Sequence, residues 1–123
     1  MINSVVLMGR LTYEPELRSS QSGKCFTNIQ IAADRDYKSD GERKTDFIDC
    51  IVWGKQAEFV KRYFHKGSMI AVTGGIQTEN YTDSKGDKRK SVTVNVSSVS
   101  FAGEKMTEAA EPITDETEYE EIE

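Results

Sequence analysis

Apolar and polar positions follow two different periods within residues 46–67, and this stretch organises the rest of the chain. A strand over residues 47–53 points its even-numbered side chains to one side and its odd-numbered side chains to the other. The even side holds Ile48, Cys50 and Val52, and the odd side holds Phe47, Asp49, Ile51 and Trp53. A strand that is buried on one face needs apolar groups on that face alone, so Phe47 and Trp53 imply a partner or a ligand on the second face.

A helix is predicted directly after this strand. Beyond Gly54 the apolar residues are spaced three or four apart, at Ala57, Val60, Tyr63 and Phe64. This is the period of an amphipathic helix, because residues at that spacing share one face. Gly67 is a typical residue for the C-terminal stop of such a helix.

The remaining apolar patterns predict four further strands, around residues 5–11, 25–34, 68–80 and 92–101. The first is a dense apolar run, and the others alternate apolar with polar positions. In the last strand the apolar side changes at Ser97-Ser98, which implies a bend. Gly74-Gly75, in the strand before it, suggests a bulge or a close backbone approach.

Two polar segments, residues 35–44 and 81–90, carry turn residues near their tips and are predicted to be loops. The chain therefore has five predicted strands, with one helix between the third and the fourth strand and no internal repeat. This all-β pattern is typical of a small closed or partly closed barrel, and a five-stranded OB-fold is the natural candidate.

Charge divides the chain into two parts of opposite sign. The net charge is −5, but residues 103–123 alone hold nine acidic residues and one basic residue. The remaining 102 residues hold 15 basic and 12 acidic residues, so the body is mildly basic. We expect residues 1–102 to form one folded domain and residues 103–123 to be a disordered acidic tail.

The chemistry of an enzyme is hard to assemble from this sequence. Cys25 and Cys50 lack metal-ligand spacing, and His65, the only histidine, is expected to act as a cation near the end of the helix. No nucleophile, P-loop or zinc-protease motif is present. We therefore expect neither catalysis nor a metal or cofactor. The absence of a signal peptide or a long apolar run predicts a cytoplasmic protein without a membrane segment.

Four aromatic residues are candidates for a binding surface instead. Phe47 and Trp53 lie on the outward side of the central strand, and Tyr37 and Tyr81 stand in the two polar segments. Basic residues accompany the rings in the sequence: Arg35, Lys38, Lys55, Lys66, Lys85, Lys88, Arg89 and Lys90. Single-stranded nucleic acid is held by rings that stack on bases and by cations that follow phosphates, and a stacked base contributes about 1–3 kcal/mol.

These residues also have structural interpretations. Phe47 and Trp53 can pack under the helix or in a subunit interface, and a single surface lysine is most often only solvated. We assign the remaining aromatic residues to the core or to packing: Phe26, Phe59, Tyr63, Phe64 and Phe101. Tyr13 belongs to the connection that leaves the first strand.

Several runs of the sequence together resemble the single-stranded DNA-binding proteins of bacteria and bacteriophages. They are MINSVVLMGRLT at residues 1–12, EPELR at 14–18, DFIDCIVWGKQAE at 46–58 and KGS at 66–68. The resemblance covers about residues 1–102. It implies an OB-fold that assembles into a homotetramer and wraps single-stranded DNA without sequence preference, in replication, recombination and repair, in the cytoplasm or nucleoid of a bacterium or an infected host.

The resemblance also implies roles for individual residues. The base-stacking rings of the family fall on Tyr37, Phe47, Trp53 and Tyr81, and its basic contacts fall on Lys55 and Lys66. Further phosphate contacts are expected from Arg35, Lys88 and Arg89, which adjoin the rings of the two polar segments. Gln77, Glu79 and Asn80 stand where family members often have basic residues, so binding along that wall is expected to be weaker.

The tail departs further from the family pattern. Family members typically end in an acidic tip closed by Pro-Phe, which docks replication and repair enzymes, whereas this chain ends in Glu118-Tyr119-Glu120-Glu121-Ile122-Glu123. Residues 104–123 therefore either dock a different set of replication or recombination proteins or compete with DNA for the basic surface. The short tail, without a Gly- or Gln-rich spacer, favours a bacteriophage or plasmid copy over a chromosomal one.

The sequence thus predicts a non-enzymatic module that coats single-stranded DNA. Two other functions remain open at this stage. One is an RNA-binding OB module, since stacking alone tolerates both sugars. The other is an interaction protein whose tail recruits replication enzymes while DNA binding is secondary.

Overall fold

The computed structural model describes residues 1–39 and 41–103, and of residues 37–39 it describes only the backbone. The helix α1 spans Lys55–Tyr63. The strands are β1 (Val5–Leu11), β2 (Arg18–Ser19), β3 (Cys25–Ser39), β4 (Glu42–Trp53), β5 (Met69–Thr82) and β6 (Lys88–Phe101). The predicted acidic tail, residues 103–123, lies outside the described residues except for Gly103.

The strands form one sheet in the order β1-β5-β6-β4-β3-β2, and pairing between β1 and β3 closes it into a barrel. All neighbours are antiparallel except β4 and β6, which pair in parallel at Cys50↔Val94 and Ile51↔Asn95. The predicted all-β OB-fold is confirmed. The helix lies between β4 and β5 rather than between a third and a fourth strand only because the two-residue strand β2 was not predicted.

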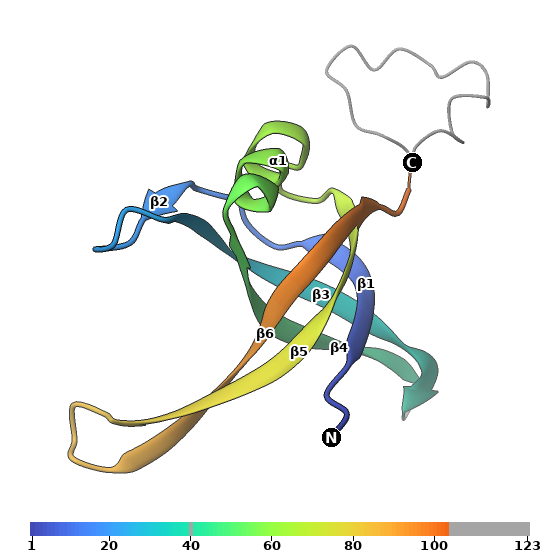
Figure 1. Ribbon diagram of the computed structural model, residues 1–123. Helices are drawn as coiled ribbons and strands as arrows, with labels where there is room; N and C mark the ends of the chain where they lie inside the picture. The colour runs from blue at the N-terminus through green and yellow to red at the C-terminus, as the bar shows by residue number, and fades with distance from the viewer. Residues whose placement is uncertain (40, 104–123) are drawn as a thin grey trace.

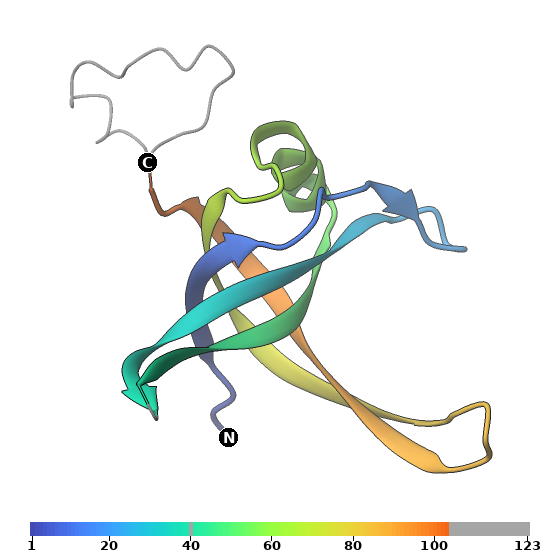
Figure 2. The same ribbon diagram turned by 180° about the vertical axis from the view of Figure 1, so that it is seen from behind.

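The two long hairpins extend further than the sequence predicts. β3 and β4 pair as far as Ser39↔Glu42, and β5 and β6 pair as far as Thr82↔Lys88, so most of the first predicted loop and half of the second are strand. Figures 1 and 2 show both hairpins extending away from the barrel in different directions, at the end opposite α1. A hairpin that is exposed on both faces needs no alternation of apolar and polar residues. The sequence pattern therefore did not predict that these polar segments are strands.

The predicted sidedness of the central strand is confirmed. Cys50 and Val52 of β4 are buried and Ile48 packs against the core, whereas Phe47 and Trp53 point outward and are exposed. The residues that fill the barrel come from every long strand and from the helix region: Leu11, Ile29, Ile31, Cys50, Val52, Ala57, Val60, Phe64, Ile70, Val72, Val94 and Val96. Burial of these side chains is the main stabilising contribution to the fold.

Helix α1 covers one end of the barrel (Figure 1). Ala57 and Val60 are its buried residues, and Phe59 contacts Phe64 and Phe101 with ring centroids 5.9 and 5.5 Å apart. The helix ends at Tyr63, earlier than the predicted stop near Gly67, because Phe64 adopts an extended backbone and is fully buried in the core. Gly67 turns the chain toward β5 with a positive φ of 90°.

The backbones of β5 and β6 approach each other closely at Gly74. A Cβ atom on Gly74 would overlap the backbone carbonyl oxygen of Asn95, so the predicted close approach is confirmed. The register shifts at the same place, since Thr73 pairs with Ser98 and Gly74 pairs with Val96. This bulge leaves Ser97 as the extra residue and accounts for the predicted change of side in β6.

One carboxylate fastens the connection after β1 to the connection after α1. Glu14 accepts a hydrogen bond from the backbone N–H of Lys66 at 3.0 Å and one from His65 Nδ1 at 2.9 Å. The hydrogen bond from the Lys66 N–H lowers the pKa of Glu14, and the hydrogen bond from His65 lowers it further. His65 therefore lies beyond the helix and pairs with a loop carboxylate, instead of acting on the end of α1 as the sequence suggested.

Replacing Gly74 with alanine is expected to destabilise the barrel by about 1–3 kcal/mol, because the added methyl group meets backbone that cannot move aside. Urea denaturation measures the free energy of unfolding. Gly75→Ala is the matched control, since a Cβ there lies 3.3 Å from its nearest neighbour, the Asn3 carbonyl oxygen. Equal losses in the two variants would contradict the close approach at Gly74.

Replacing Glu14 with glutamine is expected to lower stability at neutral pH by at most about 1 kcal/mol, since half of the side chain is exposed. A lowered folded-state pKa stabilises the fold above the ordinary glutamate pKa, and this contribution is lost as the pH falls through the folded-state pKa. The melting temperatures of the variant and the original protein should therefore converge in acid. Glu16→Gln, at an exposed pair 3.7 Å from Arg18, should change little at either pH.

Candidate nucleic-acid interface

The outward face of β3 and β4 carries two of the four predicted stacking rings. Phe47 is 62% exposed and lies opposite Ala32, whose small side chain leaves the ring face open. Trp53 is 38% exposed and lies opposite Phe26, with ring centroids 5.1 Å apart and planes tilted by 38°. Both rings point away from the core, so packing of Phe47 and Trp53 in the barrel interior is excluded.

Two further rings belong to this face and were not identified from the sequence. Phe26, assigned above to the core or to packing, is only half buried and packs on Trp53 on the outer side of the sheet. The alternation in β3 could have identified Phe26 as an outward residue, because side chains two residues apart lie on the same face and Phe26 is followed at that spacing by the polar residues Asn28 and Gln30. Tyr13 is 43% exposed and follows Thr12, whose hydroxyl donates to Gln30 on this face. Partial burial raises the pKa of the Tyr13 phenol, and the negative charge of Asp49 raises it further.

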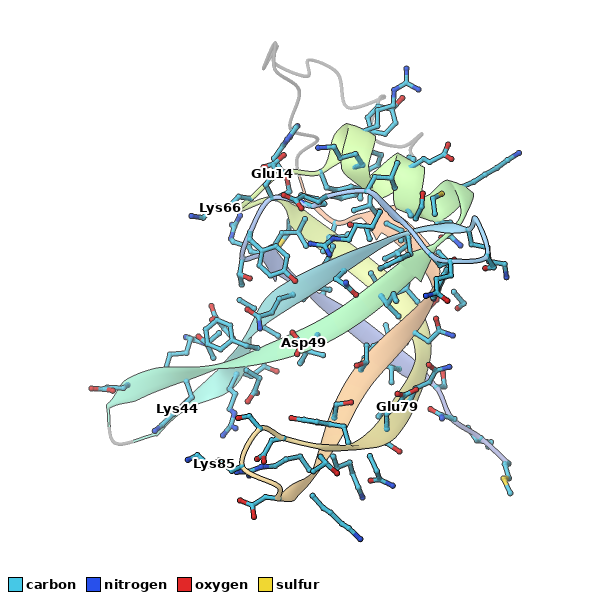
Figure 3. All side chains as sticks on the ribbon, turned by 90° about the vertical axis from the view of Figure 1, so that its left-hand side faces the viewer. Glu14, Lys44, Asp49, Lys66, Glu79 and Lys85 are labelled. Atoms are coloured by element: carbon cyan, nitrogen blue, oxygen red, sulfur yellow. The ribbon has the colours of Figure 1, made fainter. Side chains whose placement is uncertain are left out.

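A polar network occupies the middle of the same face. Gln30 donates from Nε2 to Asp49 Oδ1 at 3.1 Å, and Thr12 donates from its hydroxyl to Gln30 Oε1 at 2.9 Å. Figure 3 shows Asp49 midway along β4, with Lys66 toward the helix end of the molecule and Lys44 and Lys85 toward the hairpin end. An acidic side chain therefore lies on the central part of a face with basic residues toward both ends.

Tyr81 lies apart from these rings, on the second hairpin. It is 52% exposed on β5 and pairs across the ladder with Arg89. A groove of about 520 Å³ follows this part of the hairpin, lined by Asn80, Tyr81, Thr82, Lys88, Arg89 and Lys90. One ring and three cations thus form a second surface near the tip of the β5–β6 hairpin.

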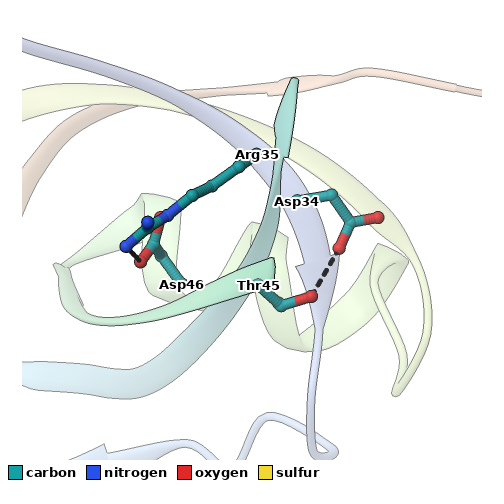
Figure 4. A network of polar contacts seen from close by, with 4 residues as sticks. All are labelled: Asp34, Arg35, Thr45 and Asp46. Carbon is teal, nitrogen blue, oxygen red and sulfur yellow. Dashed lines mark hydrogen bonds and ion pairs between the residues drawn. The ribbon is translucent and has the colours of Figure 1, made fainter. Parts of the chain in front are cut away.

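The predicted basic residues divide into two groups. Arg35 makes a bidentate pair with Asp46, with Nε–Oδ2 and Nη2–Oδ1 distances of 3.0 and 2.9 Å (Figure 4). Arg89 donates to Asp83 Oδ2 at 2.9 Å. The arginine in each pair lowers the pKa of its aspartate. Both arginines thus have a carboxylate partner, and the carboxylates hold the guanidinium groups in place on the hairpins.

The predicted lysines differ from the arginines in their partners. Among the side chains that the structure describes, Lys55, Lys66 and Lys88 form no ion pair, and all three are exposed. Lys55 begins α1 directly after Trp53 and Gly54, and Lys66 follows the helix. The ammonium groups of Lys55 and Lys66 are therefore available to phosphates near the β3–β4 face and the helix, and that of Lys88 to phosphates near Tyr81.

The side chain of Tyr37 lies outside the described residues, so its place beside the other rings stays a prediction. The backbone pairs Lys38 with Arg43 next to it, which puts Tyr37 on the β3–β4 hairpin. Within the described side chains, no group of three His, Cys, Asp or Glu residues is arranged to hold a metal ion. None of the helices in the described part of the chain has the length and apolar character needed to cross a membrane.

Comparison with known proteins agrees with this geometry. The chain is 45% identical over 89 residues to single-stranded DNA-binding protein 1 of Lactococcus lactis, covering 72% of this chain and 59% of that protein. It is 45% identical over 102 residues to the single-stranded DNA-binding protein of Halalkalibacterium halodurans, covering 82% of this chain and 61% of that protein. The chain thus spans about three-fifths of the length of these relatives.

A third relative, single-stranded DNA-binding protein 1 of Staphylococcus aureus, is 41% identical over 109 residues, which cover 88% of this chain and 70% of that protein. These three relatives are bacterial, and a bacteriophage origin stays a prediction. The model of the single-strand binding protein family matches residues 2–102, the same stretch that folds into the barrel and carries the outward rings. The chain therefore belongs to the single-strand binding protein family.

Proposed function

We propose that this protein binds single-stranded DNA without requiring a particular sequence and protects it during replication, recombination and repair. The observation that carries the proposal is the outward side of β4, where Phe47 and the Trp53–Phe26 pair are open to solvent on a member of the single-strand binding protein family. Open rings of this kind stack on unpaired bases irrespective of base identity, since every base has a π-face.

The proposed mechanism combines stacking with phosphate neutralisation. Phe47 and Trp53 each receive a base on the β3–β4 face, and Phe26 enlarges the surface next to Trp53. Tyr81 receives a base on the second hairpin, and Tyr37 completes the set of four rings. Lys55, Lys66 and Lys88 contact phosphates directly, and Arg35 and Arg89 contribute while held by their aspartates.

The domain organisation and setting are part of the proposal. Residues 1–102 form the DNA-binding domain, which agrees with the extent of the family match. Residues 103–123 form an acidic tail that contacts replication or recombination proteins or competes with DNA for the basic surface. The protein has no catalytic activity of its own, and it works in the bacterial cytoplasm or nucleoid or in those of an infected cell.

Self-assembly into a homotetramer is also proposed. Exposed apolar side chains lie on β1, β5 and β6: Val6, Met8, Ile76 and Val92. β1 pairs with β3 only at Arg10 and Leu11, so residues 5–9 have a single strand neighbour, β5. Exposed apolar groups beside a strand edge support association between copies of the chain.

Trp53→Ala is expected to weaken binding of an oligonucleotide by about 1–3 kcal/mol without unfolding the domain, because the side chain stacks on a base and lies outside the core. Anisotropy of a labelled oligo(dT) measures the affinity, and circular dichroism checks the fold. Tyr63→Ala is the control, since Tyr63 is a ring of similar exposure, 40%, on α1. Unchanged binding by Trp53→Ala, or loss of its fold, would show that Trp53 has a structural role.

Fluorescence of Trp53, the only tryptophan, tests the whole proposal. Titration with poly(dT) should quench the indole emission, and the apparent affinity should fall as salt is raised, because bound phosphates release counterions. Native mass spectrometry of the same samples should give a tetramer.

Competition with RNA of equal length identifies an RNA-binding module if RNA displaces DNA. Deletion of residues 104–123 should leave DNA binding intact, which would show that the barrel binds DNA without any recruitment of enzymes by the tail.

A further inference from the structure

An acidic residue in the middle of a DNA-binding face requires an explanation. Asp49 is exposed on the outward side of β4, between Phe47 and Ile51. Phe47 and Trp53 are six residues apart, so about 20 Å of strand separates them, and nucleotides that bridge the two rings pass over Asp49. A carboxylate repels phosphate at this position. The groups of a nucleotide that a carboxylate can bind favourably are instead the N–H donors on base edges.

The carboxylate is held in a fixed orientation. Asp49 Oδ1 accepts a hydrogen bond from Gln30 Nε2 at 3.1 Å, and Gln30 Oε1 in turn accepts the Thr12 hydroxyl at 2.9 Å. Gln30 is also the cross-strand partner of Asp49 in the β3–β4 ladder. Among the described side chains no cation pairs with Asp49. A single neutral donor thus fixes one carboxylate oxygen and leaves acceptor capacity directed at the exposed face.

The rings flanking Asp49 define where a base would lie. Phe47 lies on one side along the strand, and the Trp53–Phe26 pair lies on the other. The Thr12 hydroxyl and the Thr12 backbone N–H both donate to Gln30, at 2.9 and 3.1 Å, so the chain carries Tyr13, the next residue, past the Gln30–Asp49 pair. A nucleotide over Asp49 is therefore bordered by aromatic surface, while its edge meets a carboxylate and an amide.

Base edges differ in what they offer a carboxylate. Cytosine presents the N4 amino group, and aspartate or glutamate accepts a hydrogen bond from it. Adenine presents its N6 amino group and guanine its N2 amino group. Uracil and thymine have no exocyclic amino group, and the carbonyl oxygen at C4 would lie against the negative charge. A fixed carboxylate therefore distinguishes bases that stacking alone treats alike.

We propose that Asp49, positioned by Gln30, forms a base-reading subsite that favours nucleotides with an exocyclic amino group, such as cytosine, over uracil and thymine. This inference rests on the proposed function and adds to it a compositional preference at one position of the bound strand. The remaining contacts of the face tolerate any base. The alternative is that Asp49 only weakens binding through charge repulsion, which would affect all oligonucleotides equally.

The test compares oligo(dC) with oligo(dU) of about 15 nucleotides, a length within the range that one OB-fold occupies. In a homopolymer the same base lies over Asp49 wherever along the strand the protein binds. The two homopolymers differ mainly in the amino or carbonyl group at C4. Affinities are measured by anisotropy with the full chain at mildly alkaline pH, where cytosine is unprotonated. The readout is the ratio of the two affinities, compared between variants, so that differences in stacking strength cancel.

Asp49→Asn is the informative variant, because an asparagine can still accept the Gln30 hydrogen bond but carries no charge and also presents donors. We expect the preference for dC over dU to fall about five- to tenfold relative to the original protein. Glu79→Gln is the matched control, since it removes one exposed acid from β5, and its ratio should equal that of the original protein. Thermal melting establishes that both variants are folded.

The possible outcomes separate the inference from the proposed function. An equal rise in affinity for both homopolymers in Asp49→Asn, with an unchanged ratio, overturns the base-reading subsite and leaves DNA binding intact. A loss of preference in Glu79→Gln as large as in Asp49→Asn also overturns it, since charge alone would then set the ratio. Failure of the original protein to bind either homopolymer overturns the proposed function itself.

Discussion

The pleat of β4 is the constraint on which the rest of the molecule depends. Because successive side chains point to opposite faces, one strand supplies Cys50 and Val52 to the core and Phe47 and Trp53 to the outside. A slip of one residue against β3 would expose the core set and bury the rings together with Asp49. The register Cys50↔Ile29 and the parallel contact of β4 with β6 prevent that slip, so the barrel and the outward face that carries the rings are fixed by the same strand pairing.

Closure of the barrel supports this strand from both sides. β1 bridges β3 and β5, and the approach of the β5 backbone to Asn95 is possible only because residue 74 is glycine. Helix α1 fills the open end with Val60 and the rings around Phe64, so the strand that precedes the helix cannot loosen without opening the core. The result is a rigid surface for the outward rings, and a rigid surface loses less conformational entropy when it binds a flexible strand.

The charge that this surface presents to a ligand depends on which basic residues are paired with carboxylates and not only on the net charge. The arginines of the hairpins are held by Asp46 and Asp83, whereas the lysines near the helix have no carboxylate partner among the described side chains. In the proposed function, lysines without such partners provide the salt-sensitive part of phosphate binding. Asp49 is the exception on the face, since its charge is oriented by the neutral Gln30. That arrangement is suited to reading a base edge and unfavourable for a phosphate.

The sequence by itself determined the barrel class, the helix, the sidedness of β4 and the irregularities at Gly74 and Ser97, because apolar period and glycine placement report burial directly. It also identified Phe47, Trp53 and Tyr81 as candidate ring positions, each of which is exposed in the structure. Only the tertiary structure decided that the polar segments are hairpins, that Phe26 joins Trp53, and that Gln30 meets Asp49. These contacts join residues far apart in the chain, and strand register, which no local pattern encodes, brings them together.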